Sequence, residues 1–397
     1  MFARIALNAY TSRALLAIAL IAIVFIPVCS SVVAQGVDDS GLADLSRTDS
    51  SVEDVHVGVL GLFHPLRLTV SAPSGSAVVV HAGNERIVLE KSSGIDSATV
   101  SIAGGSVTVT AGSRTVKAFK VIVSGRRNEP ADFVLAVQEK ITRRYHGILE
   151  IKPNAGVLTA VVAMDLQTAV ASVVAAEAAP DAPFEAMKAQ AVSTRSYFVA
   201  ARGRHHEFDF CDTTHCQFLR EIPSPASAAA RAAAATRDLV LAYDAHPLAA
   251  MYTRSCSGRT HTPAEVGLPP ASYPYYSVEC RYCREHPGRW SSRLPTAEAT
   301  VLRASDENAR LIIDRRLGWS TLPSNDFVVK KDRDQLLADG IGEGHGIGLC
   351  QAGAKAMARE GADFRQILRH YYPDTAVVAW PGPASSQRGP AQTARFP

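Results

Sequence analysis

The sequence predicts an α+β fold in which helices pack on antiparallel strands, preceded by a small all-β accessory domain. Three observations support this prediction. Between residues 55 and 123, short segments rich in β-branched residues alternate with Gly, Ser and Asn. Apolar residues recur at helical spacing between Asp165 and Tyr197. Strand-like pairs at 145–163 and 238–253 lie on either side of these helices in the chain.

The first 34 residues are expected to form a signal peptide. Arg4 and Arg13 accompany an apolar run over 14–28, which has the length of a signal h-region and is short for a membrane span. Small residues ending at Ala34 fit a cleavage site. We therefore expect export to the periplasm or cell wall, with membrane contact only through this segment if it stays uncleaved. Residues 35–54 are rich in Ser, Asp and Gly and are expected to be a linker.

Composition limits the classes of partner. A chain of 397 residues with 47% hydrophobic content can bury a large core, and its length suggests two or three domains. The formal charge is +3, and losing Arg4 and Arg13 with the signal peptide would leave +1. A nearly neutral chain lacks the basic surface that binds phosphates, so we exclude nucleic acid as a partner.

The accessory domain is expected at 55–140, as an antiparallel β domain of six or more strands with a scaffold role preferred over a binding role. Its clearest strand segments are 66–72, 76–82, 85–91, 98–104, 106–112 and 119–125. The larger domain is expected at 141–378. Residues 379–397 are rich in Pro, Ser and Gln and are expected to be a disordered tail.

The larger domain begins with a strand pair, 145–151 and 156–163, that leads into the first helix. Asp165 is the expected N-cap, because its carboxylate can accept from the free amides of the first turn. Pro180 should end this helix, and Asp181 with Pro183 should begin the second one.

Glu177 is the only acid among the alanines and valines at the end of the first helix. The helix dipole disfavours a carboxylate there and apolar neighbours disfavour its charged form, so both should raise its pKa. Such a group can act as a general acid near neutral pH. Spacing alone also fits a solvated glutamate at a fraying helix end.

A loop after the second helix is rich in soft metal ligands, namely His205, His206, Cys211, His215 and Cys216. Thiolates and imidazoles together favour a tetrahedral zinc site. The alternative is a disulfide between Cys211 and Cys216 in an oxidising compartment.

Further along, Ser224 and Pro225 should open an alanine-rich helix to about Thr236, followed by a hairpin from strands at 238–243 and 247–253. The hairpin leads into Ser255–Gly258. Cys280 and Cys283 form a CxxC pair, for which a metal or a disulfide with Cys256 is the simplest explanation.

The stretch Gly342–Gly348 reads GEGHGIG, which is neither a Rossmann nor a P-loop pattern. We expect its glycines to let the backbone approach a ligand and to aim His345 into a cleft, with a structural histidine as the alternative. Helices should follow over Gln351–Glu360 and Phe364–Tyr371.

Four blocks of sequence, in this order, resemble the SpoIID/LytB family of cell-wall proteins. They are EAMKAQAVSTRSYF (Glu185–Phe198) after Glu177, FDFCDTTHCQFL (Phe208–Leu219), YTRSCSGRTHT (Tyr252–Thr262), and GEGHGIGLCQAGAKAMAREG (Gly342–Gly361) with ILRHYYPDT (Ile367–Thr375). The resemblance covers roughly Arg144 to Thr375 and implies a SpoIID-like catalytic domain at 141–378.

The resemblance also implies an activity. The substrate would be the peptidoglycan glycan strand, cleaved between N-acetylmuramic acid and N-acetylglucosamine by lytic transglycosylation, with Glu177 as the single general acid and base. Substrate contacts are implied at Gln190, Arg195, Tyr197, Ser255 and His345. A structural zinc ion beside the cleft is implied at His205, Cys211, Cys216 and His215.

Two other classes of function remain open. Part of the family resembles non-catalytic enhancers that bind the wall and stimulate an N-acetylmuramoyl-L-alanine amidase, which would then be a protein partner. A cysteine hydrolase would use Cys350 with His345 or His370. The family commonly has serine at the Cys350 position, which argues against that role.

Overall fold

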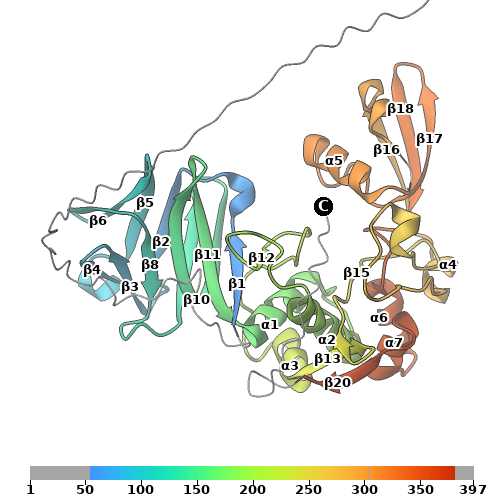
Figure 1. The fold of residues 1–397 in the computed structure, drawn as a ribbon, viewed down its shortest axis with the longest axis horizontal. Coiled ribbons are helices and arrows are strands. Elements are labelled where there is room, and N and C mark those ends of the chain that lie inside the picture. The colour runs from blue at the N-terminus through green and yellow to red at the C-terminus, as the bar shows by residue number, and fades with distance from the viewer. Residues whose placement is uncertain (1–53, 304, 381–397) are drawn as a thin grey trace, which may run out of the picture. The chain divides into compact units, whose positions relative to one another are not determined.

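The computed structural model describes residues 54–303 and 305–380, and their fold is mixed α+β (Figure 1). This confirms the predicted fold class. The predicted signal peptide, the linker up to residue 53 and the tail from residue 381 lie outside the described residues. None of the helices within the described ranges is long and apolar enough to cross a membrane.

The N-terminal part of the described chain forms one large sheet of twelve strands, and all six predicted strand segments are confirmed within it. The strands are β1 (Asp54–Val59), β2 (Arg67–Ser71), β3 (Ala77–Ala82), β4 (Glu85–Glu90), β5 (Ser97–Ala103), β6 (Ser106–Ala111), β7 (Arg114–Ala118), β8 (Val121–Ser124), β9 (Ala131–Val137), β10 (Ile141–Asn154), β11 (Val157–Asp165) and β12 (Phe210–Cys211). The main path runs β12-β1-β11-β10-β9-β2-β5-β6-β7, with β8 joining β10 to β3 and β4 beyond. All of these pairs are antiparallel except β1 with β12.

Strand β10 belongs to both halves of this sheet. Its first half pairs with β9, and its second half, from Ile148 on, pairs with β11 and β8. Gly147 lies between the halves with φ 147°, and a Cβ there would lie 2.2 Å from the carbonyl oxygen of Ala163. The expected strand pair before the first helix is therefore confirmed and is continuous with the β-rich segment. The boundary between domains at 140/141 stays a prediction.

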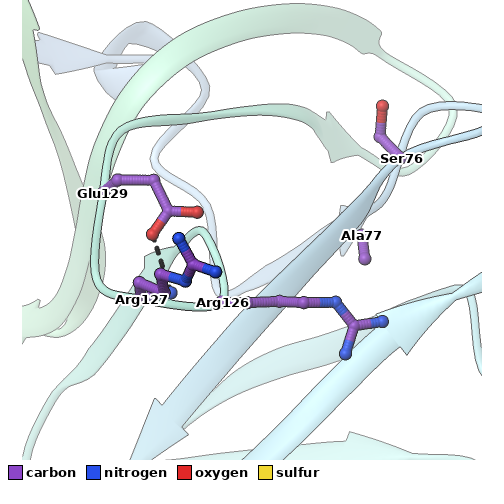
Figure 2. Close-up of a pocket in the computed structure, with 5 residues that line it drawn as sticks. All are labelled: Ser76, Ala77, Arg126, Arg127 and Glu129. Atoms are coloured by element: carbon purple, nitrogen blue, oxygen red, sulfur yellow. Dashed lines mark hydrogen bonds between the residues drawn. The ribbon is translucent and has the colours of Figure 1, made fainter.

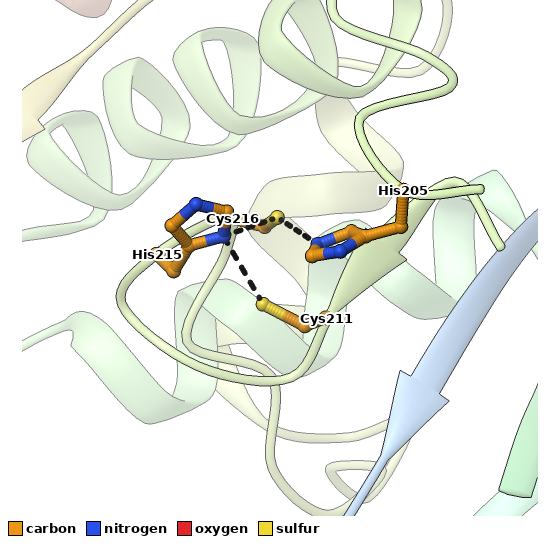
Figure 3. Close-up of side chains that lie close together, drawn as sticks. All are labelled: His205, Cys211, His215 and Cys216. Atoms are coloured by element: carbon orange, nitrogen blue, oxygen red, sulfur yellow. Dashed lines mark hydrogen bonds between the residues drawn. The ribbon is translucent and has the colours of Figure 1, made fainter. Parts of the chain in front are cut away.

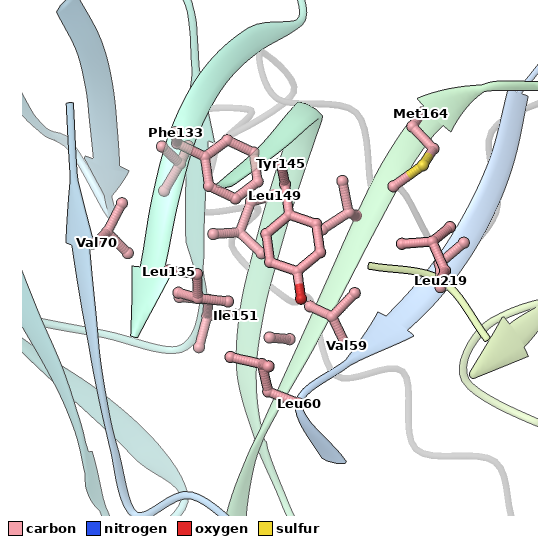
Figure 4. Packing of buried hydrophobic residues seen from close by; sticks show 14 of the residues in the cluster. Val59, Leu60, Val70, Phe133, Leu135, Tyr145, Leu149, Ile151, Met164 and Leu219 are labelled. Atoms are coloured by element: carbon pink, nitrogen blue, oxygen red, sulfur yellow. The ribbon is translucent and has the colours of Figure 1, made fainter. Parts of the chain in front are cut away.

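The main hydrophobic core lies between this sheet and the first helices. On β10, Tyr145, Leu149 and Ile151 face inward at the spacing of two that a strand requires, and Figure 4 shows them packed with Phe133 and Leu135 of β9. The rings of Phe133 and Tyr145 lie 5.9 Å apart. The same core includes the apolar stripe of the first helix, so the sheet and this helix are packed as one unit.

Three helices follow, α1 (Leu166–Glu177), α2 (Phe184–Ala200) and α3 (Ala228–Ala235). Asp165 is confirmed as the N-cap of α1, because its carboxylate accepts from the backbone N–H groups of Gln167 and Thr168 at 3.0 Å each. Asp181 does not cap α2. Instead, this exposed carboxylate forms ion pairs with Lys355 and Arg359.

Helix α3 begins later than predicted. Its N-cap is Ser227, whose hydroxyl accepts from Ala230 N–H at 3.2 Å, rather than Ser224. The hairpin that follows consists of β13 (Leu239–Tyr243) and β14 (His246–Pro247), with β20 (Ala376–Ala379) as a third strand. Asp244 and Ala245 both have positive φ, as a tight two-residue hairpin turn requires.

After the hairpin, β15 (Tyr252–Thr253) pairs in parallel with β19 (Leu349–Cys350). Helices α6 (Gln351–Arg359) and α7 (Phe364–Tyr371) then follow, close to the predicted bounds. These elements share a second core with part of α2, which contains Ala189 and Val192. This arrangement brings the end of the hairpin, at about residue 252, beside the start of α6.

An insertion between these two strands was not predicted. It contains α4 (Arg281–Glu285), β16 (Arg289–Pro295), α5 (Glu307–Leu317), β17 (Asp326–Asp332) and β18 (Gln335–Ile341). Strands β16, β18 and β17 form an antiparallel sheet, and its small core includes Leu294, Ile313 and Phe327. Single 3-10 turns lie at Gly61–Phe63, Lys91–Ser93, Pro263–Val266 and Thr296–Thr300.

The capping role of Asp165 predicts that Asp165→Ala destabilises the chain by about 1 kcal/mol, the usual value of an N-cap hydrogen bond. Thermal and urea unfolding of the purified protein measure this. Asp181→Ala is the matched control, because its ion pairs are solvent-exposed and contribute little to folding. Equal losses for the two variants would contradict the assignment of the cap.

Candidate active site

Glu177 is the last residue of α1, and the chain turns away at Ala178 with extended backbone angles. Pro180 follows two residues later and prevents the helix from continuing. The Glu177 side chain is partly buried. The carboxylate is thus at the C-terminal end of the helix dipole, where its charged form is disfavoured.

Burial raises the pKa of Glu177 to about 7, and the charge of Glu343 raises it further, while Arg254 and a hydrogen bond from Gln351 lower it. Burial is the largest of these causes, so the removal of water from the carboxyl group decides its protonation. At this pKa, both the acid and the carboxylate are present near neutral pH. A group in this state can give a proton and take one back within one reaction.

A row of buried amides lies behind Glu177. Gln351, the first residue of α6, donates from Nε2 to Oε1 of Gln190 on α2 at 3.3 Å. Gln190 is 3% exposed and donates in turn to the hydroxyl of Thr194 at 3.4 Å. Gln190 therefore orients Gln351, and Gln351 is the amide that reaches the Glu177 carboxyl group.

Two charged residues in front of Glu177 were missed by the sequence analysis. Arg254 Nε lies 3.0 Å from Oε1 of Glu343, and both side chains are about half exposed. The backbones of Ser255 and Glu343 exchange two hydrogen bonds, of 3.0 and 2.8 Å, which hold this ion pair in place. Ser255, an expected substrate contact, thus positions Glu343 through its backbone. Their charge was the signal that could have identified them, because each is within two positions of an expected substrate contact. Arg254 directly precedes Ser255, and Glu343 is two positions before His345.

Tyr252 connects this cluster to the histidine and cysteine loop. Its hydroxyl donates to Oε1 of Gln217 at 2.5 Å, and Gln217 directly follows Cys216. Burial raises the pKa of Tyr252, and the charge of Glu177 raises it further. Tyr252 therefore joins the loop to β15 and responds to the charge of the acid.

The GEGHGIG stretch approaches the chain's own backbone instead of the expected ligand. Its four glycines all have positive φ. A Cβ at Gly344 would lie 2.4 Å from Thr253 Oγ1, and one at Gly348 would lie 2.0 Å from the carbonyl oxygen of Met251. The Thr253 hydroxyl donates to the Glu343 carbonyl and accepts from Gly346 N–H. The glycines thus allow this loop to lie along β15.

His345 is a structural histidine in this arrangement. Its Nδ1 accepts from Ile347 N–H at 3.0 Å, and the ring also has a hydrogen bond with the backbone of Tyr252. Burial lowers the pKa of His345 to about 4, despite the opposing charge of Glu307. The imidazole is therefore neutral at neutral pH and holds the loop, while a substrate contact of His345 stays a prediction.

Arg195 and Tyr197, two of the expected substrate contacts, lie in the core. The Arg195 guanidinium is 1% exposed and donates to the carbonyls of Leu239 and Ala233 and to Gln167. Tyr197 packs on Phe210, with ring centroids 6.0 Å apart. Both side chains therefore join α2 to its neighbours.

The four predicted metal ligands come together, as Figure 3 shows. His205 Nε2 lies 3.2 Å from Cys216 Sγ, and His215 Nδ1 lies 3.4 Å from Cys216 Sγ and 3.6 Å from Cys211 Sγ. All four ligand atoms lie within 4.8 Å of one another, and both cysteines are free thiols. A hydrogen bond from Cys216 lowers the pKa of the Cys211 thiol. His206 is not in this group and is exposed.

Cys350 is not arranged as a nucleophile. Its thiol is buried and lies 3.5 Å from Cys283 Sγ. The two histidines proposed as its base make other contacts, His345 with Ile347 N–H and His370 with the carbonyl of Glu279. This geometry contradicts a cysteine hydrolase.

A separate pocket lies in the β-rich segment. It has a volume of about 690 Å³ and is lined by Ser76, Ala77, Arg126, Arg127 and Glu129 (Figure 2). The Glu129 carboxylate accepts from the backbone N–H of Arg127 at 2.7 Å. These lining residues contain none of the groups around Glu177, so this pocket is not part of the candidate active site.

Residues 154–243 match the family described as SpoIID, stage II sporulation protein. This segment contains Glu177, all of α2 and the four histidine and cysteine ligands. This part of the chain is therefore similar to the SpoIID family. The family resemblance found in the sequence is thereby confirmed.

Three relatives differ in how much of their own length aligns with this chain. An uncharacterized protein of Brachyspira hyodysenteriae is 26% identical over 267 residues, which is 59% of this chain and 72% of the relative. The amidase enhancer of Bacillus subtilis is 41% identical over 64 residues, and stage II sporulation protein D of the same species is 39% identical over 56 residues. The aligned parts span only 9% and 16% of these two proteins.

The raised pKa of Glu177 predicts a pH-dependent stability. The folded-state pKa of about 7 exceeds the ordinary value of 4.5, so the stability contributed by this group is present below pH 4.5 and is lost as the pH rises to 7. Glu177→Gln should therefore gain up to about 3 kcal/mol relative to wild type between pH 4.5 and pH 8, at 1.36 kcal/mol per unit. Thermal unfolding across this range measures the gain.

Glu343→Gln is the matched control for this prediction, because it removes an exposed carboxylate from the same cluster. Its stability relative to wild type should change little over the same range. A stability gain for Glu177→Gln that is the same at every pH would show that the Glu177 carboxyl group is not held protonated by the fold.

Proposed function

We propose that this protein is an exported cell-wall enzyme that cleaves the bond between N-acetylmuramic acid and N-acetylglucosamine in peptidoglycan by lytic transglycosylation. The observation that carries the proposal is the pKa of Glu177, about 7, in a cluster with Gln351, Arg254 and Glu343. Similarity to the SpoIID family supports a function at the cell wall.

The proposed reaction needs one carboxyl group. Glycosidases that use water commonly need two, one as acid and one as base or nucleophile. Here Glu177 donates its proton to the glycosidic oxygen as the bond to C1 of the muramic acid breaks. The resulting carboxylate takes the proton of the 6-hydroxyl of the same sugar, and that oxygen bonds to C1. The product is a 1,6-anhydro sugar, and no water is consumed.

The neighbours of Glu177 assist in different ways. Gln351 holds the carboxylate in one orientation, because Gln190 fixes the other side of the Gln351 amide. Arg254 is exposed and positively charged, so it lowers the cost of forming the carboxylate after the proton has left. Its ion pair with Glu343 limits this effect and keeps the pKa near neutrality.

We also propose that His205, Cys211, His215 and Cys216 hold a structural zinc ion. The donor set fits, because two thiols and two imidazoles with all ligand atoms within 4.8 Å suit tetrahedral zinc. Zinc would supply rigidity to the loop. Gln217 would then be held in a fixed position, where its Oε1 accepts the hydrogen bond from the Tyr252 hydroxyl. The chemistry itself is left to Glu177.

The direct test is digestion of purified peptidoglycan, followed by mass spectrometry of the products. Wild type should release 1,6-anhydro products. Glu177→Gln should release them at a rate lower by about 1,000-fold or more, because general acid–base catalysis contributes on that order and this group is both the proton donor and the proton acceptor. Asp181→Ala removes an exposed carboxylate outside the cluster, so it is the control and should match wild type, while Glu343→Gln should still form 1,6-anhydro products. Reducing-end sugars from wild type, lost in Glu343→Gln, would instead identify a two-carboxylate hydrolase.

A non-catalytic enhancer is the second candidate, because one relative is named amidase enhancer. In that case the chain alone would release no sugar products, and it would increase the release of stem peptides by an added N-acetylmuramoyl-L-alanine amidase. Glu177→Gln would then stimulate the amidase as well as wild type does.

The zinc proposal predicts that Cys216→Ser loses one zinc ion per chain and shows a lower midpoint of thermal unfolding. Metal analysis by mass spectrometry and circular dichroism measure these effects. His206→Ala, an exposed neighbour outside the ligand set, is the control and should keep its zinc. A protein that retained its full zinc content after Cys216→Ser would exclude this ligand set.

A further inference from the structure

A second group of soft ligands lies outside the site described so far. It consists of Cys256, Cys280, Cys283 and Cys350, whose sulfur atoms all lie within 4.8 Å of one another. Each of these four side chains is at most 2% exposed. Nothing in the proposed reaction uses these thiols, so their convergence requires a separate explanation.

The four cysteines come from three separate segments of the chain. Cys350 ends β19 and Cys256 follows β15, and the parallel pairing of Thr253 with Cys350 brings the two together. Cys280 is the N-cap of the short helix α4, and Cys283 lies within that helix. Cys280 N–H donates to the carbonyl of Gly258 at 2.9 Å, which fixes the CxxC turn beside the Cys256 segment.

The surroundings of the sulfur atoms suit negative charge. Cys350 Sγ accepts from the backbone N–H groups of Cys256 at 3.4 Å and Gly353 at 3.5 Å. The Tyr371 hydroxyl lies 3.4 Å from Cys280 Sγ. Hydrogen bonds of this kind stabilise thiolates that bind a metal, because they spread the charge of each sulfur. Four buried neutral thiols would have little use for such donors.

Gly353 keeps this space open. A Cβ at that position would lie 2.5 Å from Cys280 Sγ and 2.0 Å from the Tyr371 hydroxyl oxygen. Any larger residue would therefore push the thiol or the phenol out of the cluster. The first turn of α6 is thus shaped around the sulfur atoms.

The arrangement fits one ion better than two disulfides. All four sulfurs are mutually close, whereas two disulfides would need closeness only within each pair. Cys283 Sγ and Cys350 Sγ lie 3.5 Å apart, well beyond the length of a disulfide bond, and all four cysteines are free thiols. In a tetrahedral site with zinc–sulfur bonds of about 2.3 Å, neighbouring sulfurs lie about 3.8 Å apart.

We propose that Cys256, Cys280, Cys283 and Cys350 bind a structural zinc ion, distinct from the ion at His205, Cys211, His215 and Cys216. Four thiolates complete the tetrahedron and leave no position for water, so this ion has no catalytic role. Thiolate ligands of this number favour zinc or iron over harder cations such as calcium and magnesium. In an exported protein, zinc also protects the thiols from oxidation.

The ion would also fix the geometry around Glu177, and this consequence rests on the proposed function. Cys350 directly precedes Gln351, and Cys256 is two residues after Arg254. Gln351 and Arg254 are the two groups that lower the pKa of Glu177. By joining the ends of β15 and β19, the bound ion would therefore keep Gln351 and Arg254 close to the Glu177 carboxyl group.

The test is native mass spectrometry of the full chain, purified without oxygen and without added reductant or chelator, so that native thiols stay reduced and native disulfides stay intact. Wild type should carry two zinc ions. Cys283→Ser and Cys216→Ser should each carry one, and the double variant none. X-ray absorption at the zinc edge then separates the sites, because Cys216→Ser should retain only sulfur ligands and Cys283→Ser should retain both nitrogen and sulfur. These readouts do not depend on wall cleavage, so they stand even if the lytic activity is absent.

Two results would overturn this proposal. In the first, wild type carries one zinc ion with mixed nitrogen and sulfur ligands, and its denatured mass shows two disulfides among Cys256, Cys280, Cys283 and Cys350. In the second, Cys283→Ser retains two zinc ions. If Cys283→Ser fails to fold, the wild-type measurement alone decides whether the four cysteines bind a metal. Iron in place of zinc would overturn the identity of the metal.

Discussion

The parallel pairing of β15 with β19 is the constraint on which the candidate site depends. It consists of two residue pairs, Tyr252 with Leu349 and Thr253 with Cys350, from segments about a hundred residues apart in the chain. Arg254 follows one strand and Gln351 follows the other, so this short pairing brings both a cation and an amide to act on the Glu177 carboxyl group. Glycines with positive φ on the β19 side permit the approach, because side chains there would collide with β15.

The acid itself comes from a third segment, which is held independently. Helix α1 is fixed at its start by the Asp165 cap and along its length by the core against the sheet. Its end therefore has a defined position against the β15–β19 pair. The carboxyl group is partly shielded from water at that junction, and this shielding, more than any neighbouring charge, sets its pKa near 7. The raised pKa of Glu177 thus follows from where the helix ends.

The local features of the fold could be predicted from the sequence, because they depend on neighbouring residues. These include the strand segments, the Asp165 cap, α7 and the group formed by His205, Cys211, His215 and Cys216, whose ligands lie within one loop. Glu177 stood out as an isolated acid among alanines and valines, but spacing alone also fitted a solvated glutamate, and the family resemblance made it the candidate acid.

The long-range features could not be predicted in this way. Arg254 and Glu343 form their ion pair across 89 positions, and the backbone of Cys256 reaches the Cys350 sulfur across 94. No local pattern connects such residues. Gln190, Arg195 and Tyr197 were expected to contact the substrate because they share a sequence block with the site. All three are buried, since nearly every side of α2 packs on its neighbours.

Strand β10 connects the β-rich segment to the part of the chain that carries Glu177. Because this one strand pairs with β9 and β8 as well as with β11, backbone hydrogen bonds join the β-rich segment to the hairpin that leads to α1. The start of the helix that ends in Glu177 is therefore anchored to the same sheet that forms the β-rich segment.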